Sequence, residues 1–100
     1  MKVMIDLCIV PLGAGLSVSP FVTECHKVIR EHGLEPVLHA YGTGIEGEWE
    51  HVMETVKKCF EKVHEMGAPR VHATMRLGTR NDREQSMQDK VDSVNRKLGM

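Results

Sequence analysis

A carboxylate flanked by glycines marks the segment Tyr41-Gly42-Thr43-Gly44-Ile45-Glu46-Gly47. Glycines within a strand let a ligand or another backbone approach closely. If Ile45 faces the helices, the alternation of side chains along a strand puts Glu46 on the opposite face, near Asp6 or the row of His72 and Arg76. A buried charge there needs a partner. Glu46 is therefore a candidate ligand-binding or ion-pairing residue. The alternative is that it ends the strand in solvent or begins the next helix.

Two serines precede a predicted helix and follow the glycine-rich stretch Gly13-Ala14-Gly15. That stretch lacks the lysine of a P-loop and the full GxGxxG pattern, so it is a weak phosphate signal. Ser19 stands before Pro20, where a serine oxygen can accept a bond from a free amide at the helix start. Ser17 has no such capping role, and its hydroxyl could face a ligand.

The histidines and cysteines do not form a recognisable reactive or metal-binding motif. The six histidines contain no HExxH-type pair, and the three cysteines, an odd number, have no C-x-x-C spacing. Cys25 and His26 are neighbours on a predicted helix and point about 100° apart, so they cannot act as a nucleophile and its base. We predict no metal and no cofactor, and we interpret the cysteines as small apolar residues in a reducing compartment.

Composition and charge exclude several classes of protein. The 100 residues are 41% hydrophobic and 27% charged, with a formal net charge of −1. A chain of this length predicts one domain, residues 1–100. The mixed charges offer no basic field for nucleic acid or for an anionic membrane. No apolar run is long enough to span a bilayer and no cleavage site follows the first strand, so we expect a cytoplasmic protein.

The hydrophobic pattern predicts seven elements. Residues 3–10 alternate as a strand that Pro11 ends, and residues 20–32 have helical spacing up to Gly33. Further strands are predicted at 36–41, 43–47 and 70–77, with helices from 48 to about 66 and from 87 to 98. The order β-α-β-β-α-β-α predicts an α+β, ferredoxin-like fold, in which two long helices cover one face of a four-stranded antiparallel sheet and a C-terminal helix is added.

Two apolar surfaces remain after the long helices are placed. The first strand is apolar on both faces, although the helices can cover only one of them. The last helix carries a narrow apolar seam made of Met87, Val91, Val94 and Leu98. Both surfaces predict a homo-oligomer, a homodimer or a homotetramer.

Phe60 and Val28 lie in the stripes that face the sheet, and we expect Phe60→Ala to cost about 3–5 kcal/mol of stability.

Several segments together resemble a known family. They are Val10-Pro11-Leu12-Gly13, Ser17-Val18-Ser19, Gly67-Ala68-Pro69-Arg70-Val71, and the glycine-rich segment extended through Glu48 and Trp49. In these the chain resembles the small thiamine-binding-protein family, which is similar to the YkoF-type proteins that bind thiamine and hydroxymethylpyrimidine. The resemblance covers almost the whole chain. It implies a ferredoxin-like fold, dimers joined through their sheets and often paired into tetramers, and ligand binding without catalysis.

The leading hypothesis is therefore non-catalytic binding of thiamine or a related aminopyrimidine. The resemblance places polar ligand-binding positions at Ser17, Thr43 and Glu46, and we add Ser19 and His39 as candidates. Glu46 would anchor the ring amine, so we expect Glu46→Gln to weaken binding more than folding. One alternative is a small-metabolite enzyme with Glu46, Asp6 or His39 as general base. Another is a metabolite-sensing regulatory oligomer that contacts a partner protein through its last helix.

Overall fold

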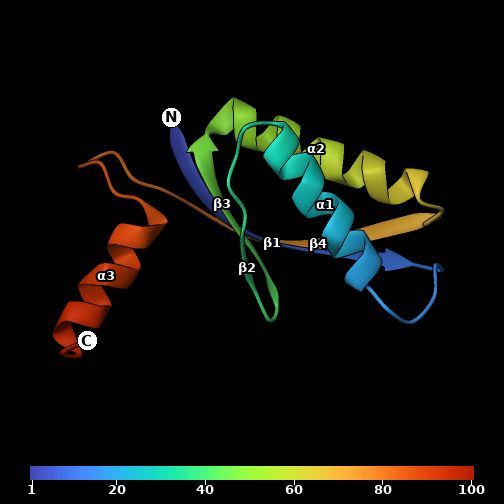
Figure 1. Cartoon of the computed structure of the whole chain (residues 1–100). Coiled ribbons are helices and arrows are strands. Elements are labelled where there is room, and N and C mark those ends of the chain that lie inside the picture. The colour runs from blue at the N-terminus through green and yellow to red at the C-terminus, as the bar shows by residue number, and fades with distance from the viewer.

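The computed structural model describes all residues from 1 to 100 and contains four strands and three helices (Figure 1). Their order confirms the predicted β-α-β-β-α-β-α arrangement. The elements are β1 (Lys2–Leu12), α1 (Ser19–Glu31), β2 (Val37–His39), β3 (Gly42–Glu48), α2 (Trp49–Glu65), β4 (Arg70–Thr79) and α3 (Met87–Lys97).

The four strands form one sheet in the order β2-β3-β1-β4, and every neighbouring pair is antiparallel. Helices α1 and α2 lie side by side over one face of this sheet, while α3 lies apart from them (Figure 1). The α+β, ferredoxin-like prediction is confirmed. We call the sheet surface under α1 and α2 the helix face and the opposite surface the open face.

The core lies between the helix face and the two long helices. Alternate residues of β1 point into it, and Ile45 of β3 is completely buried between them. The helices contribute residues at helical spacing, which is why α1 and α2 form as amphipathic helices. The fully or almost fully buried side chains are Val3, Ile5, Leu7, Ile29, Ile45, Val52, Thr55, Cys59, Val63 and Ala68.

Two local predictions are wrong. Pro11 does not end β1, which continues to Leu12 and pairs there with β4. The β3 partner of β1 ends opposite Leu7, so beyond that residue β1 has a free edge, and a proline without an amide hydrogen is tolerated on such an edge. Ser19 is the first residue of α1 rather than its cap; the cap position is Val18, and no side chain caps this helix.

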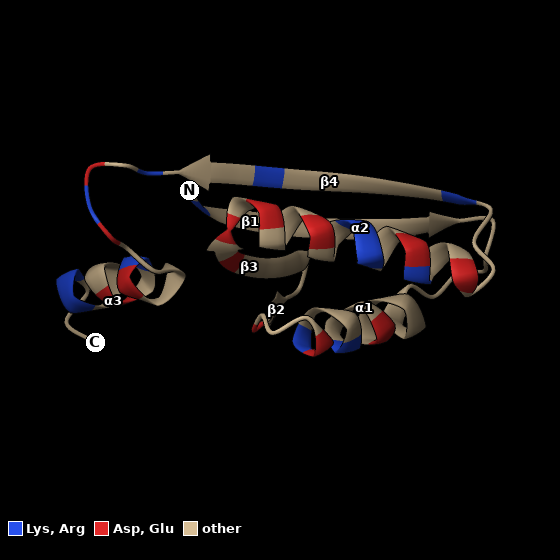
Figure 2. Cartoon of the chain, turned by 90° about the horizontal axis from the view of Figure 1, so that it is seen from above, with Lys and Arg blue, Asp and Glu red and all other residues tan.

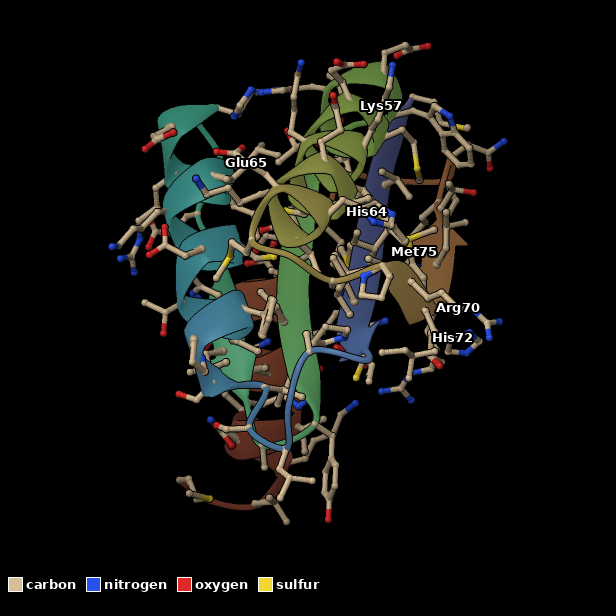
Figure 3. The ribbon with its side chains drawn as sticks, turned by 90° about the vertical axis from the view of Figure 1, so that its right-hand side faces the viewer. Lys57, His64, Glu65, Arg70, His72 and Met75 are labelled. Atoms are coloured by element: carbon tan, nitrogen blue, oxygen red, sulfur yellow. The ribbon has the colours of Figure 1, made fainter.

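The open face carries fewer buried side chains. Helix α3 touches it through Met87, whose sulfur lies close to Gly44 of β3, but no residue of α3 is buried. On β4, at the edge of the sheet, Arg70 and His72 are exposed on this face, and Met75, which pairs with Leu7 and so shares the helix face, is exposed there (Figure 3). None of the three helices combines the length and hydropathy that a bilayer-spanning segment requires.

Candidate functional site

A groove of about 730 Å³ opens between α1, the free edge of β1 and the β2–β3 hairpin. It exists because β3 is shorter than β1: past Leu7 no strand covers the edge of β1, and α1 passes above the gap. Most of its wall is hydrophobic, and it contains no aspartate or glutamate. An apolar cleft with few convergent polar groups is the usual form of a small-molecule site. The groove is lined by residues 7–10 of β1, by Val18, Ser19, Phe21, Val22, Thr23, Cys25, His26, Lys27, Ile29 and Arg30 of the α1 segment, and by residues 38–43 of the hairpin.

The main polar contact inside the groove joins α1 to β3. His26 Nε2 lies 3.0 Å from Thr43 Oγ1, and Thr43 is only 7% exposed. Burial, and then the positive charge of Arg30, lower the pKa of His26, so its imidazole is neutral near pH 7. A neutral imidazole and a hydroxyl can each donate and accept a hydrogen bond. The pair can therefore recognise a heterocycle that carries both an amine and a ring nitrogen.

The structure brings together three of the five predicted ligand residues. Ser19, His39 and Thr43 border the groove, although the ring of His39 is bonded to Asp6 on the open face; Ser17 is exposed and does not line the groove. Glu46 lies on the open face, opposite Met4 of β1, and its carboxylate accepts the backbone N–H of Met87 at 2.9 Å. Because Thr43 points to the helix face, the sheet separates it from Glu46. Within one chain the two cannot contact the same small ligand.

Sequence reasoning missed His26. Its place at the border of the apolar stripe of α1 indicated a surface residue, and it is in fact half-buried against Thr43. The helical spacing of Phe21, Cys25 and Ile29 could have located it beside the core, but only the tertiary structure shows which strand residue it meets.

A second polar cluster crosses the open face. Asp6 of β1 accepts hydrogen bonds from Arg76 of β4 at 2.8 Å and from His39 of β2 at 2.6 Å. The bonds from Arg76 and then His39 lower the pKa of Asp6, which therefore stays ionised. The other ring nitrogen of His39 accepts the backbone N–H of Tyr41 at 3.3 Å. Both oxygens of Asp6 and both ring nitrogens of His39 thus have partners within the protein, and the cluster ties the hairpin to the sheet.

Gly42 leaves the room that this cluster requires. A Cβ at this position would lie 2.8 Å from Asp6 Oδ1 and 3.1 Å from the backbone oxygen of Leu7. We expect Gly42→Ala to destabilise the protein by about 1–3 kcal/mol, because the strand cannot move away from its neighbour. Urea denaturation measures the loss. Gly78→Ala is the matched control, since a Cβ there meets no atom within 4 Å; equal effects of the two substitutions would contradict the packing of Gly42.

A second cavity, of about 610 Å³, lies between the open face and α3 with its preceding loop. Five cationic side chains line it, two of them on the loop after β4, where Figure 2 shows alternating blue and red segments. It is less apolar than the groove, and its cations disfavour a positively charged guest. The five are Lys2, Arg76, Arg80, Arg83 and Lys90.

Comparison with known proteins identifies relatives along most of the chain. A family model described as thiamine-binding protein matches residues 5–95. A UPF0045 protein of Synechocystis is 55% identical over 94% of this chain and 78% of its own length. A UPF0045 protein of Eremothecium gossypii is 49% identical over 95% of this chain and 91% of its own length.

Solved structures show the same fold. The crystal structure of a Methanocaldococcus jannaschii protein has a TM-score of 0.86 at 28% identity, with 94% of this chain and 96% of that one covered. A candidate thiamine biosynthesis/salvage protein of Thermotoga maritima has a TM-score of 0.79 at 19% identity, covering 94% and 99% of the two chains. With the family model matched along residues 5–95, the resemblance seen in the sequence is confirmed: this chain belongs to the thiamine-binding protein family.

Proposed function

We propose that the protein binds thiamine or a related aminopyrimidine such as hydroxymethylpyrimidine, without transforming it, in the groove beneath α1. The observation that carries the proposal is the partly buried His26–Thr43 pair at 3.0 Å inside a largely apolar groove. Membership of the thiamine-binding protein family supports the ligand class. A groove of about 730 Å³ is within the size range of small-molecule sites.

The charges of the groove favour the pyrimidine as the part of the ligand that enters. Lys27 and Arg30 line the groove and no carboxylate does. A neutral aminopyrimidine ring enters such a site at a lower electrostatic cost than the cationic thiazolium ring of thiamine. The ring would lie between the apolar walls while His26 and Thr43 bond to its amine and ring nitrogen. Ser19, also in the wall of the groove, would contact a substituent of the ring, whereas the His39 ring stays bonded to Asp6 on the open face.

Titration calorimetry of the wild-type protein with hydroxymethylpyrimidine and with thiamine tests this proposal. We expect saturable heat with both and binding of hydroxymethylpyrimidine at least as tight as that of thiamine. Proton NMR of the mixture after incubation should show the added ligand unchanged. Absence of heat with either compound would overturn the binding function, and conversion of either would favour the enzyme alternative.

We also propose that the protein acts as a cytoplasmic homo-oligomer, at least a dimer, with no nucleic-acid partner. Val91 and Val94 on α3 and Leu98 at its C-cap are 52%, 56% and 66% exposed, and a row of apolar side chains this exposed favours burial against another chain. Residues Met75 and Leu77 of β4 add further exposed apolar surface. Two distinct isologous contacts would give a tetramer of dihedral symmetry.

Sedimentation equilibrium at micromolar concentration is expected to give a multiple of the 11.3 kDa chain mass. Changing both Val91 and Val94 to aspartate should remove the contact made by α3 and reduce a tetramer to a dimer. Lys97→Asp, a surface change on the same helix, should leave the mass unchanged. A wild-type mass equal to that of one chain would refute the oligomer and would leave α3 as a surface for a different partner protein.

A further inference from the structure

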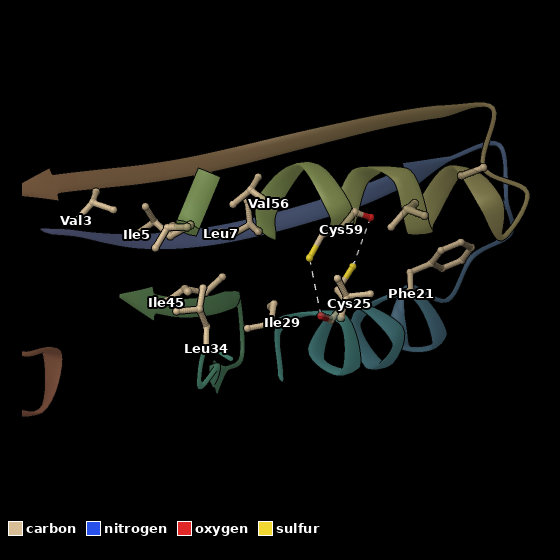
Figure 4. Close-up of a cluster of buried hydrophobic side chains, with 14 residues drawn as sticks. Val3, Ile5, Leu7, Phe21, Cys25, Ile29, Leu34, Ile45, Val56 and Cys59 are labelled. Carbon is tan, nitrogen blue, oxygen red and sulfur yellow. Dashed lines mark hydrogen bonds between the residues drawn. The ribbon is translucent and has the colours of Figure 1, made fainter. Parts of the chain in front are cut away.

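Two cysteines face each other across the interface of the long helices. Cys25 on α1 and Cys59 on α2 direct their sulfur atoms into the same space between the helices (Figure 4). Their contacts are reciprocal: Cys25 Sγ lies 4.0 Å from the backbone oxygen of Cys59, and Cys59 Sγ lies 3.8 Å from that of Cys25. Each thiol therefore reaches the backbone of the other residue, so the two cysteines are neighbours across the helix interface and are candidates for a disulfide.

The two thiols differ in their surroundings. Cys59 is completely buried, whereas Cys25 retains 7% exposure and lines the groove, so Cys25 is the more accessible of the two to a small oxidant. A hydrogen bond from Cys59 lowers the pKa of Cys25, although burial opposes it, while the same bond and burial raise the pKa of Cys59. Because Cys25 is also the more exposed of the two, it is the thiol that we expect to react first.

We propose that Cys25 and Cys59 form a reversible disulfide when the protein meets hydrogen peroxide, and that this bond cross-links α1 to α2 beneath the groove. In the first step the Cys25 thiolate attacks one peroxide oxygen, the O–O bond breaks, hydroxide leaves and a sulfenic acid forms. In the second step the sulfur of Cys59 attacks the sulfur of Cys25, the S–O bond breaks, and the hydroxyl group takes up the proton of Cys59 and leaves as water. Overall, two thiols and one peroxide give one disulfide and two waters.

The cross-link would act on the groove because Cys25 lies both in the interface between α1 and α2 and in the wall of the groove. A covalent bond between the helices restricts how α1 can move relative to α2, and α1 carries the groove residues Phe21 and His26. The bond also closes a loop between positions 34 residues apart, which restricts the unfolded chain. This inference goes beyond the proposed ligand function and can be tested without any ligand.

The test treats the reduced full-length protein with hydrogen peroxide and follows the intact mass and the digested peptides. We expect a mass lower by two hydrogens, a peptide pair joined through Cys25 and Cys59, full reversal by dithiothreitol, and an unfolding midpoint at higher denaturant concentration in the oxidised form. Cys8→Ser, which removes the thiol on the open face, should give the same result. Because the wild-type protein supplies the main result, the test does not depend on a core variant that fails to fold.

Cys59→Ser provides the second arm. Without its resolving thiol, Cys25 should gain one oxygen instead of forming the linked pair, and this product should be trapped by a sulfenic-acid reagent. The proposal is overturned if peroxide leaves Cys25 and Cys59 as free thiols while Cys8 is oxidised, or if the only disulfide formed joins two chains through Cys8.

Discussion

Replacement of Ile45 by alanine is expected to lower the free energy of unfolding by about 2–5 kcal/mol. Ile45 has no exposed surface and lies on β3, the strand that carries both Thr43 and Glu46. Removing three carbon atoms at such a position loses their transfer free energy and leaves a cavity that the sheet and α2 cannot fully close. Urea denaturation followed by circular dichroism measures the loss.

Leu77→Ala on β4 is the matched control for Ile45→Ala. Leu77 lies in the same sheet but is 43% exposed, so its truncation should cost much less. The same reasoning corrects the expectation for Phe60, which is only partly buried at the edge of the core; Phe60→Ala should fall below the predicted 3–5 kcal/mol range. Val28 is buried as predicted. A loss below about 0.5 kcal/mol for Ile45→Ala would contradict the placement of β3 in the core.

Thr43→Val is expected to weaken the binding of hydroxymethylpyrimidine by about 10- to 100-fold, which corresponds to about 1–3 kcal/mol. The substitution keeps the shape of the side chain and removes the hydroxyl that lies 3.0 Å from His26, so the ligand loses a partner and the imidazole loses its orientation. Calorimetric titration measures the dissociation constant. Thr74→Val, the same substitution on the exposed part of β4, is the control and should leave it unchanged.

Glu46→Gln distinguishes the groove beneath α1 from a ligand site around Glu46 on the open face, which the sequence suggested. With the carboxylate of Glu46 bonded to the amide of Met87 on the open face, the change should loosen α3 and leave ligand affinity within about two-fold of wild type. If instead Glu46→Gln weakens binding more than Thr43→Val does, the anchor is Glu46 and the ligand site lies on the open face.

The parts of the structure that follow from short-range patterns were predictable. Period-two and helical spacing of apolar residues predicted all seven elements, because burying those residues requires that periodicity. The pattern also predicted that Glu46 faces away from Ile45, and this is confirmed. The same alternation, applied to Thr43, would have shown that it shares the face of Ile45 and cannot share a ligand with Glu46.

Contacts between distant positions were not predictable. Asp6 meets His39 and Arg76 at separations of 33 and 70 residues, and no local pattern encodes such a meeting. The reciprocal contact of Cys25 and Cys59 depends on how two helices cross, so each cysteine looked like an ordinary core residue. The groove depends on β3 being shorter than β1, a property of strand register rather than of residue type.

The central claim is that an aminopyrimidine binds beneath α1, against His26 and Thr43. Its most direct test is the titration of ¹⁵N-labelled protein with hydroxymethylpyrimidine, followed by two-dimensional NMR of the backbone amides. We predict saturable shifts at His26, Thr43 and the hairpin residues Ala40 and Tyr41, with little change at Glu46 and Met87. Shifts concentrated at Glu46, Met87 and the rest of α3, or no shifts at all, would contradict it.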